Sequence, residues 1–136
     1  MSEENVEVVR ESAEAFNRQD AEAFVATASP DVEWEDSIFW SGLPRTYRGK
    51  VGLREWLNQV QEAWESIHVE VEEITEAAAD RLFFALVITG RGKGSGVEAP
   101  ELRVWSVTWF ADGKVTRRRV FRERAEALEA AGLSDG

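Results

Sequence analysis

The stretch LRVWSVTWFADGKVTRRRVF, residues 102–121, determines the fold class of this chain. Val, Trp and Thr dominate its first half, and apolar and polar residues alternate through its second half, as in two neighbouring strands. Asp112-Gly113 lies between the halves and favours a two-residue turn, because both residues tolerate a positive φ. The stretch therefore predicts an antiparallel β-hairpin with strands over residues 102–110 and 115–121.

Both faces of this hairpin are largely apolar. Successive strand residues point to opposite faces, so Trp105 and Trp109 share one face while Ser106 and Thr108 share the other. Arg118 joins the Ser106 face when the even-numbered positions point inward, and a register one residue off would exchange the faces. A sheet with two apolar faces needs cover on both, and the helices expected upstream can cover only one. We therefore expect a homodimer packed sheet to sheet, with Trp105 and Trp109 as anchors.

Helices and further strands are expected around the hairpin from the spacing of apolar residues. The expected helices span residues 2–17, 21–28, about 51–64 and 122–131. The expected upstream strands span residues 32–36, 68–74 and 82–89. Asp20 is placed to cap the second helix and Gly132 to end the last one. No linker or repeat interrupts this order, so residues 1–136 are expected to form one α+β domain.

Charge and residue counts argue against several classes of function. The chain has 16 Lys and Arg against 26 Asp and Glu, a net charge of −10, so nucleic acid and membrane surfaces are not expected partners. It has no Cys, and its one His, His68, lies in a strand whose polar side faces water. We therefore expect no metal and no organic cofactor. The first residues lack a signal-peptide pattern, which predicts a cytoplasmic location.

The strand over residues 32–36, VEWED, carries the most interesting carboxylate. Asp36 follows Trp34 by two residues, so its carboxyl group points to the side of the indole and away from Glu33 and Glu35. Partial burial beside an indole would make Asp36 usable as a general base or acid near neutral pH. The alternative is that Asp36 ends the strand and hydrogen-bonds the following loop. Large rings are numerous, with six Trp and seven Phe, and such rings fill cores, pockets or interfaces.

Five segments together resemble the SnoaL-like branch of the nuclear transport factor two-like superfamily, which includes the ketosteroid isomerases. They are NRQD at 17–20, WED at 34–36, YRGKVGLR at 47–54, FADGKV at 110–115 and AEALEAAGL at 125–133. The resemblance implies a cone: a curved mixed or antiparallel sheet wrapped around three N-terminal helices, with a short C-terminal helix. It also implies an interior pocket and dimerisation through the outer face of the sheet. The fold hosts several activities and does not determine one.

The resemblance also assigns roles to particular residues. The general-base Asp of the ketosteroid isomerases falls on Asp36, while their two oxyanion donors, a Tyr and a second Asp, fall on about Ser12 and Ser106. The catalytic carboxylates of the epoxide hydrolases have no counterpart at residues 81–83 or at Val120. The inward late-strand candidates for the acid/base Asp of polyketide cyclases include Ser106 and Arg118, and none of them is a carboxylate. The base of a steroid isomerase is therefore present without its usual partners.

The expected function is a small-molecule pocket, with acid/base chemistry of the isomerase, cyclase or lyase type on a small apolar or cyclic ligand. Asp36 and Arg118 are the expected catalytic residues. The expected ligand contacts are Phe16, Trp34, Trp40, Tyr47, Trp56, Ser106, Thr108 and Val120. The alternative is a non-catalytic ligand-binding or dimerisation module. A third function, binding of another protein through the sheet, would require a monomer that exposes Trp105 and Trp109.

Overall fold

The computed structural model of the chain describes residues 2–36, 45–92 and 98–133. The elements in chain order are α1 (Ser2–Arg18), α2 (Ala21–Ala26), β1 (Ala28–Asp36), β2 (Arg45–Arg48), α3 (Gly49–Ala63), β3 (Trp64–Ala78), β4 (Arg81–Gly92), β5 (Glu98–Ala111), β6 (Lys114–Phe121) and α4 (Arg124–Ala131). The strands form one sheet in the order β2-β1-β6-β5-β4-β3. Neighbouring strands are antiparallel except β1 and β6, which are parallel.

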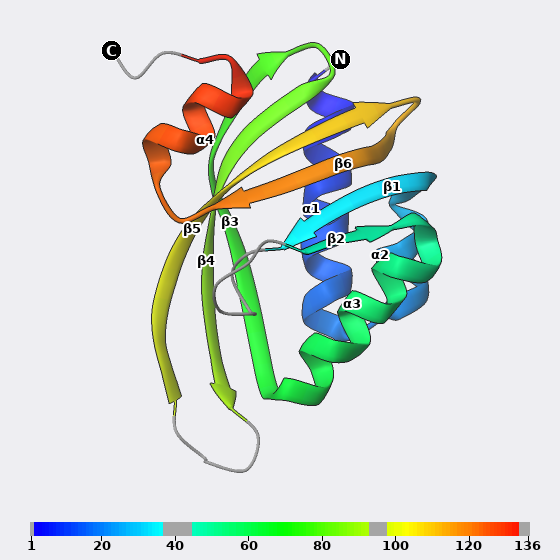
Figure 1. The fold of residues 1–136 in the computed structure, drawn as a ribbon, viewed down its shortest axis with the longest axis vertical. Helices are drawn as coiled ribbons and strands as arrows, with labels where there is room; N and C mark the ends of the chain where they lie inside the picture. The colour runs from blue at the N-terminus through cyan, green and yellow to red at the C-terminus, as the bar shows by residue number, and fades with distance from the viewer. Residues whose placement is uncertain (1, 37–44, 93–97, 134–136) are drawn as a thin grey trace.

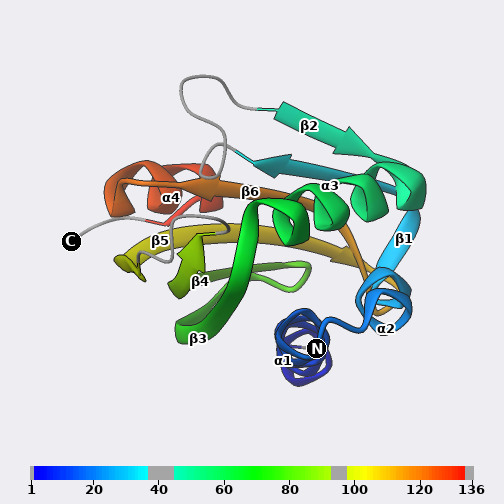
Figure 2. The ribbon, with the colours of Figure 1, turned by 90° about the horizontal axis from the view of Figure 1, so that it is seen from below.

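The sheet is strongly curved, and helices lie on both of its sides (Figures 1 and 2). Helices α1, α2 and α3 lie on one side, and the short α4 lies on the other (Figure 1). This arrangement confirms the expected α+β class, with a curved mixed sheet against three N-terminal helices and a short C-terminal helix. None of the helices in the described ranges combines the length and the apolar character needed to cross a bilayer.

The β5–β6 hairpin has the predicted turn and the predicted faces. Ala111 pairs with Lys114, and Asp112 and Gly113 between them have φ values of 51° and 73°. These values are typical of the tight turn that an Asp-Gly pair favours. On β5 the even-numbered residues Ser106 and Thr108 are buried on the side of the N-terminal helices, so the register with even positions inward is confirmed.

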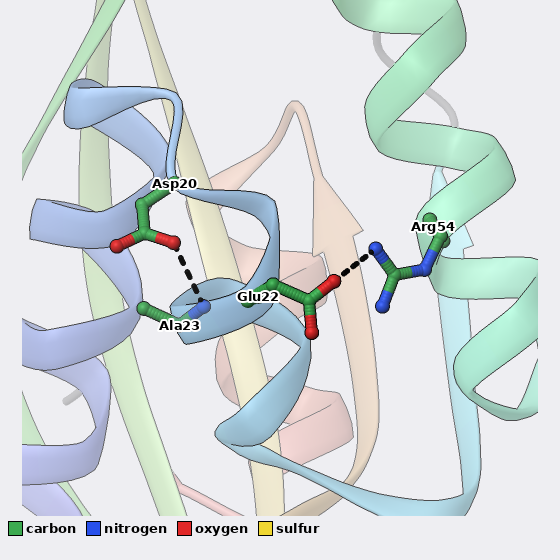
Figure 3. Close-up of polar contacts among 4 residues, drawn as sticks. All are labelled: Asp20, Glu22, Ala23 and Arg54. Carbon is green, nitrogen blue, oxygen red and sulfur yellow. Dashed lines mark hydrogen bonds and ion pairs between the residues drawn. The ribbon is translucent and has the colours of Figure 1, made fainter.

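Helix α2 is short, and two polar contacts hold it (Figure 3). Asp20 is its N-cap, and its Oδ1 accepts a hydrogen bond of 3.1 Å from the backbone N–H of Ala23, as the sequence predicted. Arg54 on α3 donates a hydrogen bond of 2.8 Å to Glu22 Oε1. Because both residues of this ion pair are substantially exposed, its contribution to stability is at most about 1 kcal/mol. The apolar residues Phe24 and Val25 provide the main anchor of α2 in the core.

Helix α1 is tied to the edge strand β3 by the side chain of Asn17. Its Nδ2 donates to the carbonyl oxygen of Val69, and its Oδ1 accepts from the N–H of the same residue, each at 2.9 Å. An edge strand presents unpaired backbone groups, and this amide satisfies one donor and one acceptor at once. Asn17 thereby fixes the position of α1 against the sheet.

Replacing Asn17 by Ala is expected to lower the free energy of unfolding by about 1–2 kcal/mol, because two backbone groups of Val69 lose their partner. Urea unfolding followed by far-UV circular dichroism measures this change. Asn58→Ala on the exposed face of α3 is the matched control and should change stability by less than about 0.5 kcal/mol. Equal effects of the two substitutions would contradict a special role for Asn17.

The strand boundaries differ from the sequence prediction at several places. Trp64, expected to end the third helix, already begins β3, which extends to Ala78. Ala28, expected to end the second helix, already belongs to β1, and that strand contains Pro30. The pairing of β1 with β6 shifts between Ala28 and Glu33, which accommodates a residue without an N–H. The strand β2 was not predicted, because four residues with two exposed Arg carry no alternating apolar pattern.

Helix α4 covers part of the outer face of the sheet. Its Ala127, Leu128 and Ala131 form an apolar cluster with Phe83 of β4 and Val107 of β5, all of them buried. Trp105 and Trp109 pack at the border of this cluster and are partly buried. The guanidinium groups of Arg81 and Arg117 lie 5.8 and 5.0 Å from the ring centre of Trp109.

The prediction that outer-face apolar residues require a second copy was therefore too simple, because α4 buries the centre of that face within one chain. The homodimer through Trp105 and Trp109 stays a prediction.

Candidate functional site

A cavity lies between the N-terminal helices and the inner face of the sheet. The volume of this cavity is about 80 Å³. The lining residues come from α1, α2, α3 and five of the six strands, and most of them are apolar. They are Val9, Ser12, Ala13, Phe16, Phe24, Trp34, Trp56, Val69, Val71, Phe84, Leu86, Ile88, Ser106, Thr108, Val115 and Arg118.

Four aromatic rings from four different elements meet at one part of this wall. Phe16 of α1 lies 5.9 Å from Trp56 of α3, and Phe24 of α2 lies 5.5 Å from Trp34 of β1 in an edge-to-face arrangement. The two indoles are 5.2 Å apart and tilted by 56°. Such distances and angles are favourable for aromatic pairs. The cluster gives the cavity a rigid wall that suits a planar apolar ring.

Arg118 of β6 brings a positive charge into this aromatic wall. Its guanidinium carbon lies 4.0 Å from the ring centre of Trp34 and 5.5 Å from that of Trp56. Within the described part of the chain, the guanidinium makes one hydrogen bond, from Nη1 to the backbone oxygen of Glu35 at 2.7 Å. Burial lowers the pKa of Arg118 from its ordinary value to about 10, and the nearby charges of Asp36 and Glu35 oppose this shift. The group remains charged at neutral pH.

Asp36 lies at the end of β1 and is only 1 % exposed. Its Oδ2 accepts a hydrogen bond of 2.7 Å from the indole N–H of Trp56. Asp36 is not among the residues that line the cavity. Its carboxyl group is connected to the cavity wall through its hydrogen bond with Trp56. Its negative charge compensates Arg118, and its hydrogen bond fixes the orientation of the Trp56 ring.

Two hydroxyl groups add further polarity to the inner face of the sheet. Ser106 Oγ and Thr108 Oγ1 lie 3.0 Å apart and are hydrogen-bonded to each other. Both residues are buried and line the cavity. Because one hydroxyl donates within this pair, one hydroxyl hydrogen remains to donate elsewhere. Ser12 of α1 is the third hydroxyl residue on the wall.

The structure brings six of the ten residues predicted for the site to the cavity wall and leaves three described ones off it. The six are Phe16, Trp34, Trp56, Ser106, Thr108 and Arg118. The three are Asp36, Tyr47 and Val120. Tyr47 is buried and donates a hydrogen bond of 2.6 Å to Gln59 Oε1, and Val120 packs against Ile88 and Val104. Trp40 lies outside the described residues.

Several lining residues were not predicted. Val9 and Phe24 carry a helical apolar pattern that signals a core position, and nothing in that pattern separates a core residue from a cavity-lining one. Val69, Val71, Phe84 and Leu86 lie on the inner faces of β3 and β4. Alternation is present around Val69 and Val71, whereas Phe84 and Leu86 lie in a continuous apolar run that does not separate the two faces. In both strands only the curvature of the sheet decides that an empty space remains beside them.

Among the described residues there is no cluster of three or more His, Asp or Glu side chains that could hold a metal ion. The imidazole of His68 is 55 % exposed and 3.8 Å from Glu70, so it lies on the surface as expected. The chemistry available at the cavity is therefore hydrogen-bond donation by a guanidinium and by hydroxyls. Asp36 adds a buried carboxylate behind the wall.

Comparison with known proteins agrees with this geometry. A family model for the SnoaL-like domain matches residues 9–118. An NTF2-like protein of unknown function from Burkholderia pseudomallei is 25% identical over 93% of this chain and 95% of its own, with a TM-score of 0.77. A search of curated protein sequences gives no match.

Two further crystal structures of the same fold contain a ligand. TerC, crystallised with polyporic acid, is 24% identical over 95% of this chain and 98% of its own, with a TM-score of 0.77. Rv0760c of Mycobacterium tuberculosis, in complex with estradiol-17β-hemisuccinate, is 20% identical over 86% of this chain and 92% of its own, with a TM-score of 0.74.

Proposed function

The chain belongs to the SnoaL-like domain family, and on that premise we propose that its cavity binds a small, mostly apolar, cyclic ligand on which Asp36 and Arg118 act by proton transfer. One observation carries the proposal: a buried guanidinium lies on the wall of an otherwise apolar cavity, against the faces of Trp34 and Trp56. The aromatic wall suits a ring, and Arg118 suits an oxygen on that ring. TerC and Rv0760c, which share the fold, were crystallised with polyporic acid and with estradiol-17β-hemisuccinate.

The energetics of Arg118 support a functional role. Because the pKa falls to about 10, folding disfavours the charged guanidinium by about 3 kcal/mol, even with Asp36 and Glu35 nearby. An apolar side chain at this position would avoid that cost. A charge retained in a cavity at the expense of stability is typical of binding and active sites.

The proposed chemistry is proton abstraction next to a ligand carbonyl. Asp36 is the one carboxylate that is buried among the described residues, so it is the candidate base. Arg118, with Ser106 or Thr108, would donate hydrogen bonds to the oxygen on which negative charge develops. Donors that are fixed before the reaction lower the barrier, because they need no reorganisation as charge appears.

Non-catalytic binding is the second candidate, and the position of Asp36 favours it. The carboxylate does not line the cavity, and its Oδ2 is already bound by the Trp56 indole. In this case Asp36 only positions Trp56 and compensates Arg118. The cavity would then bind and release a ligand without changing it chemically.

Exchange of deuterium at the α-carbon of small cyclic ketones, followed by proton NMR in D₂O, distinguishes the two functions. The proton-transfer function predicts that Asp36→Asn lowers the exchange rate at least about 100-fold while ketone binding persists. Arg118→Met should lower both binding and exchange, whereas Arg117→Met, at an exposed position on the opposite face of β6, should change neither. Exchange that is unaffected by Asp36→Asn would rule out Asp36 as the base. Binding without exchange in the wild-type protein would favour the non-catalytic function.

A further inference from the structure

We propose that the cavity selects ligands of a single ring that carry an acidic, hydrogen-bond-accepting oxygen, and that it discriminates against amines of the same shape. This inference rests on the proposed function, namely that the cavity binds a small ligand. It adds the chemical class of that ligand. The class follows from which polar groups the wall offers, from how its aromatic faces are used and from the size of the space.

The polar groups on the wall are mainly donors. Arg118 offers a cationic fork of N–H groups, of which one is used by the backbone oxygen of Glu35. The Ser106–Thr108 pair has one hydroxyl hydrogen left to donate. None of the described lining residues is a carboxylate or a side-chain amide, so hydroxyl lone pairs are the only side-chain acceptors on that wall. A ligand with acceptor oxygens finds partners here, and an ammonium group finds few.

The negative charges near Arg118 are directed elsewhere. The Glu35 carboxylate is bound by Arg119 Nε at 3.2 Å, and Asp36 Oδ2 is bound by the Trp56 indole. Neither carboxylate lines the cavity, whereas Arg118 does. The charged group on the cavity wall is therefore the guanidinium of Arg118, while the carboxylate that compensates it lies off the wall.

The indole faces that Arg118 covers are also unavailable to a cationic ligand. Indole faces attract ammonium and guanidinium groups at ring distances of up to about 6 Å. Here Arg118 itself occupies that position over Trp34 and Trp56, at 4.0 and 5.5 Å. A ligand amine would have to displace Arg118 or lie beside it, and the second choice places two positive charges together.

The volume limits the ring system. A protein cavity of about 150 Å³ holds one benzene ring, so a cavity of about 80 Å³ fits at most a single ring, and a larger skeleton would require the wall to move. A monocyclic aromatic acid therefore represents the predicted class. Its ring would contact Phe16, Trp34 and Trp56, and its carboxylate would accept from Arg118.

Three single-ring probes of nearly equal shape test this prediction by isothermal titration calorimetry at one fixed salt concentration. They are benzoate, benzyl alcohol and benzylammonium. We expect the acid to bind about tenfold to hundredfold more tightly than the alcohol, because a hydrogen bond between two charged groups is much stronger than one with a neutral partner. The ammonium compound should bind more weakly than the alcohol.

Arg118→Met should remove the advantage of the acid over the alcohol, because it lowers the affinity for the acid far more than the affinity for the alcohol. Arg117→Met removes the same charge from the outer face of the sheet, where Arg117 is exposed beside Trp109, and should leave the order of the three affinities unchanged. The wild-type comparison decides the question even if Arg118→Met fails to fold. An alcohol or ammonium compound that binds as tightly as the acid would overturn this inference while leaving the proposed pocket intact. Binding of none of the three would contradict the proposed function itself, and this inference with it.

Discussion

Replacing Asp36 by Ala is expected to lower the free energy of unfolding by about 3–5 kcal/mol, one of the two largest single-residue effects expected in this protein. Two losses combine in this substitution. The Trp56 indole N–H loses its acceptor at 2.7 Å in a buried site, and Arg118 loses the larger of the two attractions that offset its burial. Chemical denaturation at neutral pH measures the change.

A double substitution separates the charge from the hydrogen bond. If Arg118 is the main cause, Asp36→Ala combined with Arg118→Met should cost less than Asp36→Ala alone, because no uncompensated buried charge remains. Asp31→Ala, at an exposed position of the same strand, is the control and should change stability by less than about 0.5 kcal/mol. A cost below about 1 kcal/mol for Asp36→Ala would show that Arg118 does not depend on this carboxylate.

The arrangement of Arg118 could be predicted from the sequence, and that of Asp36 could not. The Asp112-Gly113 turn fixes the register of the last hairpin, and alternation then places Ser106, Thr108 and Arg118 on one face. The same rule correctly puts Asp36 on the side of Trp34. It does not show that Trp56, twenty residues later and on a helix, takes the carboxylate as its acceptor. That contact depends on how α3 packs against β1, which no local pattern contains.

The outer face of the sheet illustrates the same limit at longer range. Alternation correctly identifies an apolar face with Trp105, Val107 and Trp109, and the end of the last helix at Gly132 was also predicted. Helix α4 has a weak amphipathic pattern, since its buried residues are two Ala and one Leu. The sequence therefore gave no reason to pack it onto the sheet. Two contacts with distant residues hold it there: Arg124 bound to Glu73 at 2.6 Å and Arg81 Nη1 bound to the Ala131 oxygen at 2.7 Å.

The second large effect is expected at Phe83, whose ring is 0 % exposed beneath α4. Phe83→Ala should lower the free energy of unfolding by about 3–5 kcal/mol, because the lost ring leaves a cavity between α4 and the sheet. Val51→Ala, at a side chain that is 83 % exposed, serves as the control and should have little effect.

The dependence of stability on protein concentration shows whether α4 or a second copy of the chain buries Phe83. Since α4 covers Phe83 within one chain, the cost of Phe83→Ala should be the same at low and high micromolar concentrations. A cover supplied by a second copy would behave differently, because stability then rises with protein concentration and an interface substitution removes that rise. If the wild-type midpoint rises with concentration and the Phe83→Ala midpoint does not, the subunit partner and not α4 is the main cover of Phe83. If both midpoints rise in parallel, the predicted dimer forms through the partly buried Trp105 and Trp109 at the border of the α4 cluster and leaves Phe83 to α4.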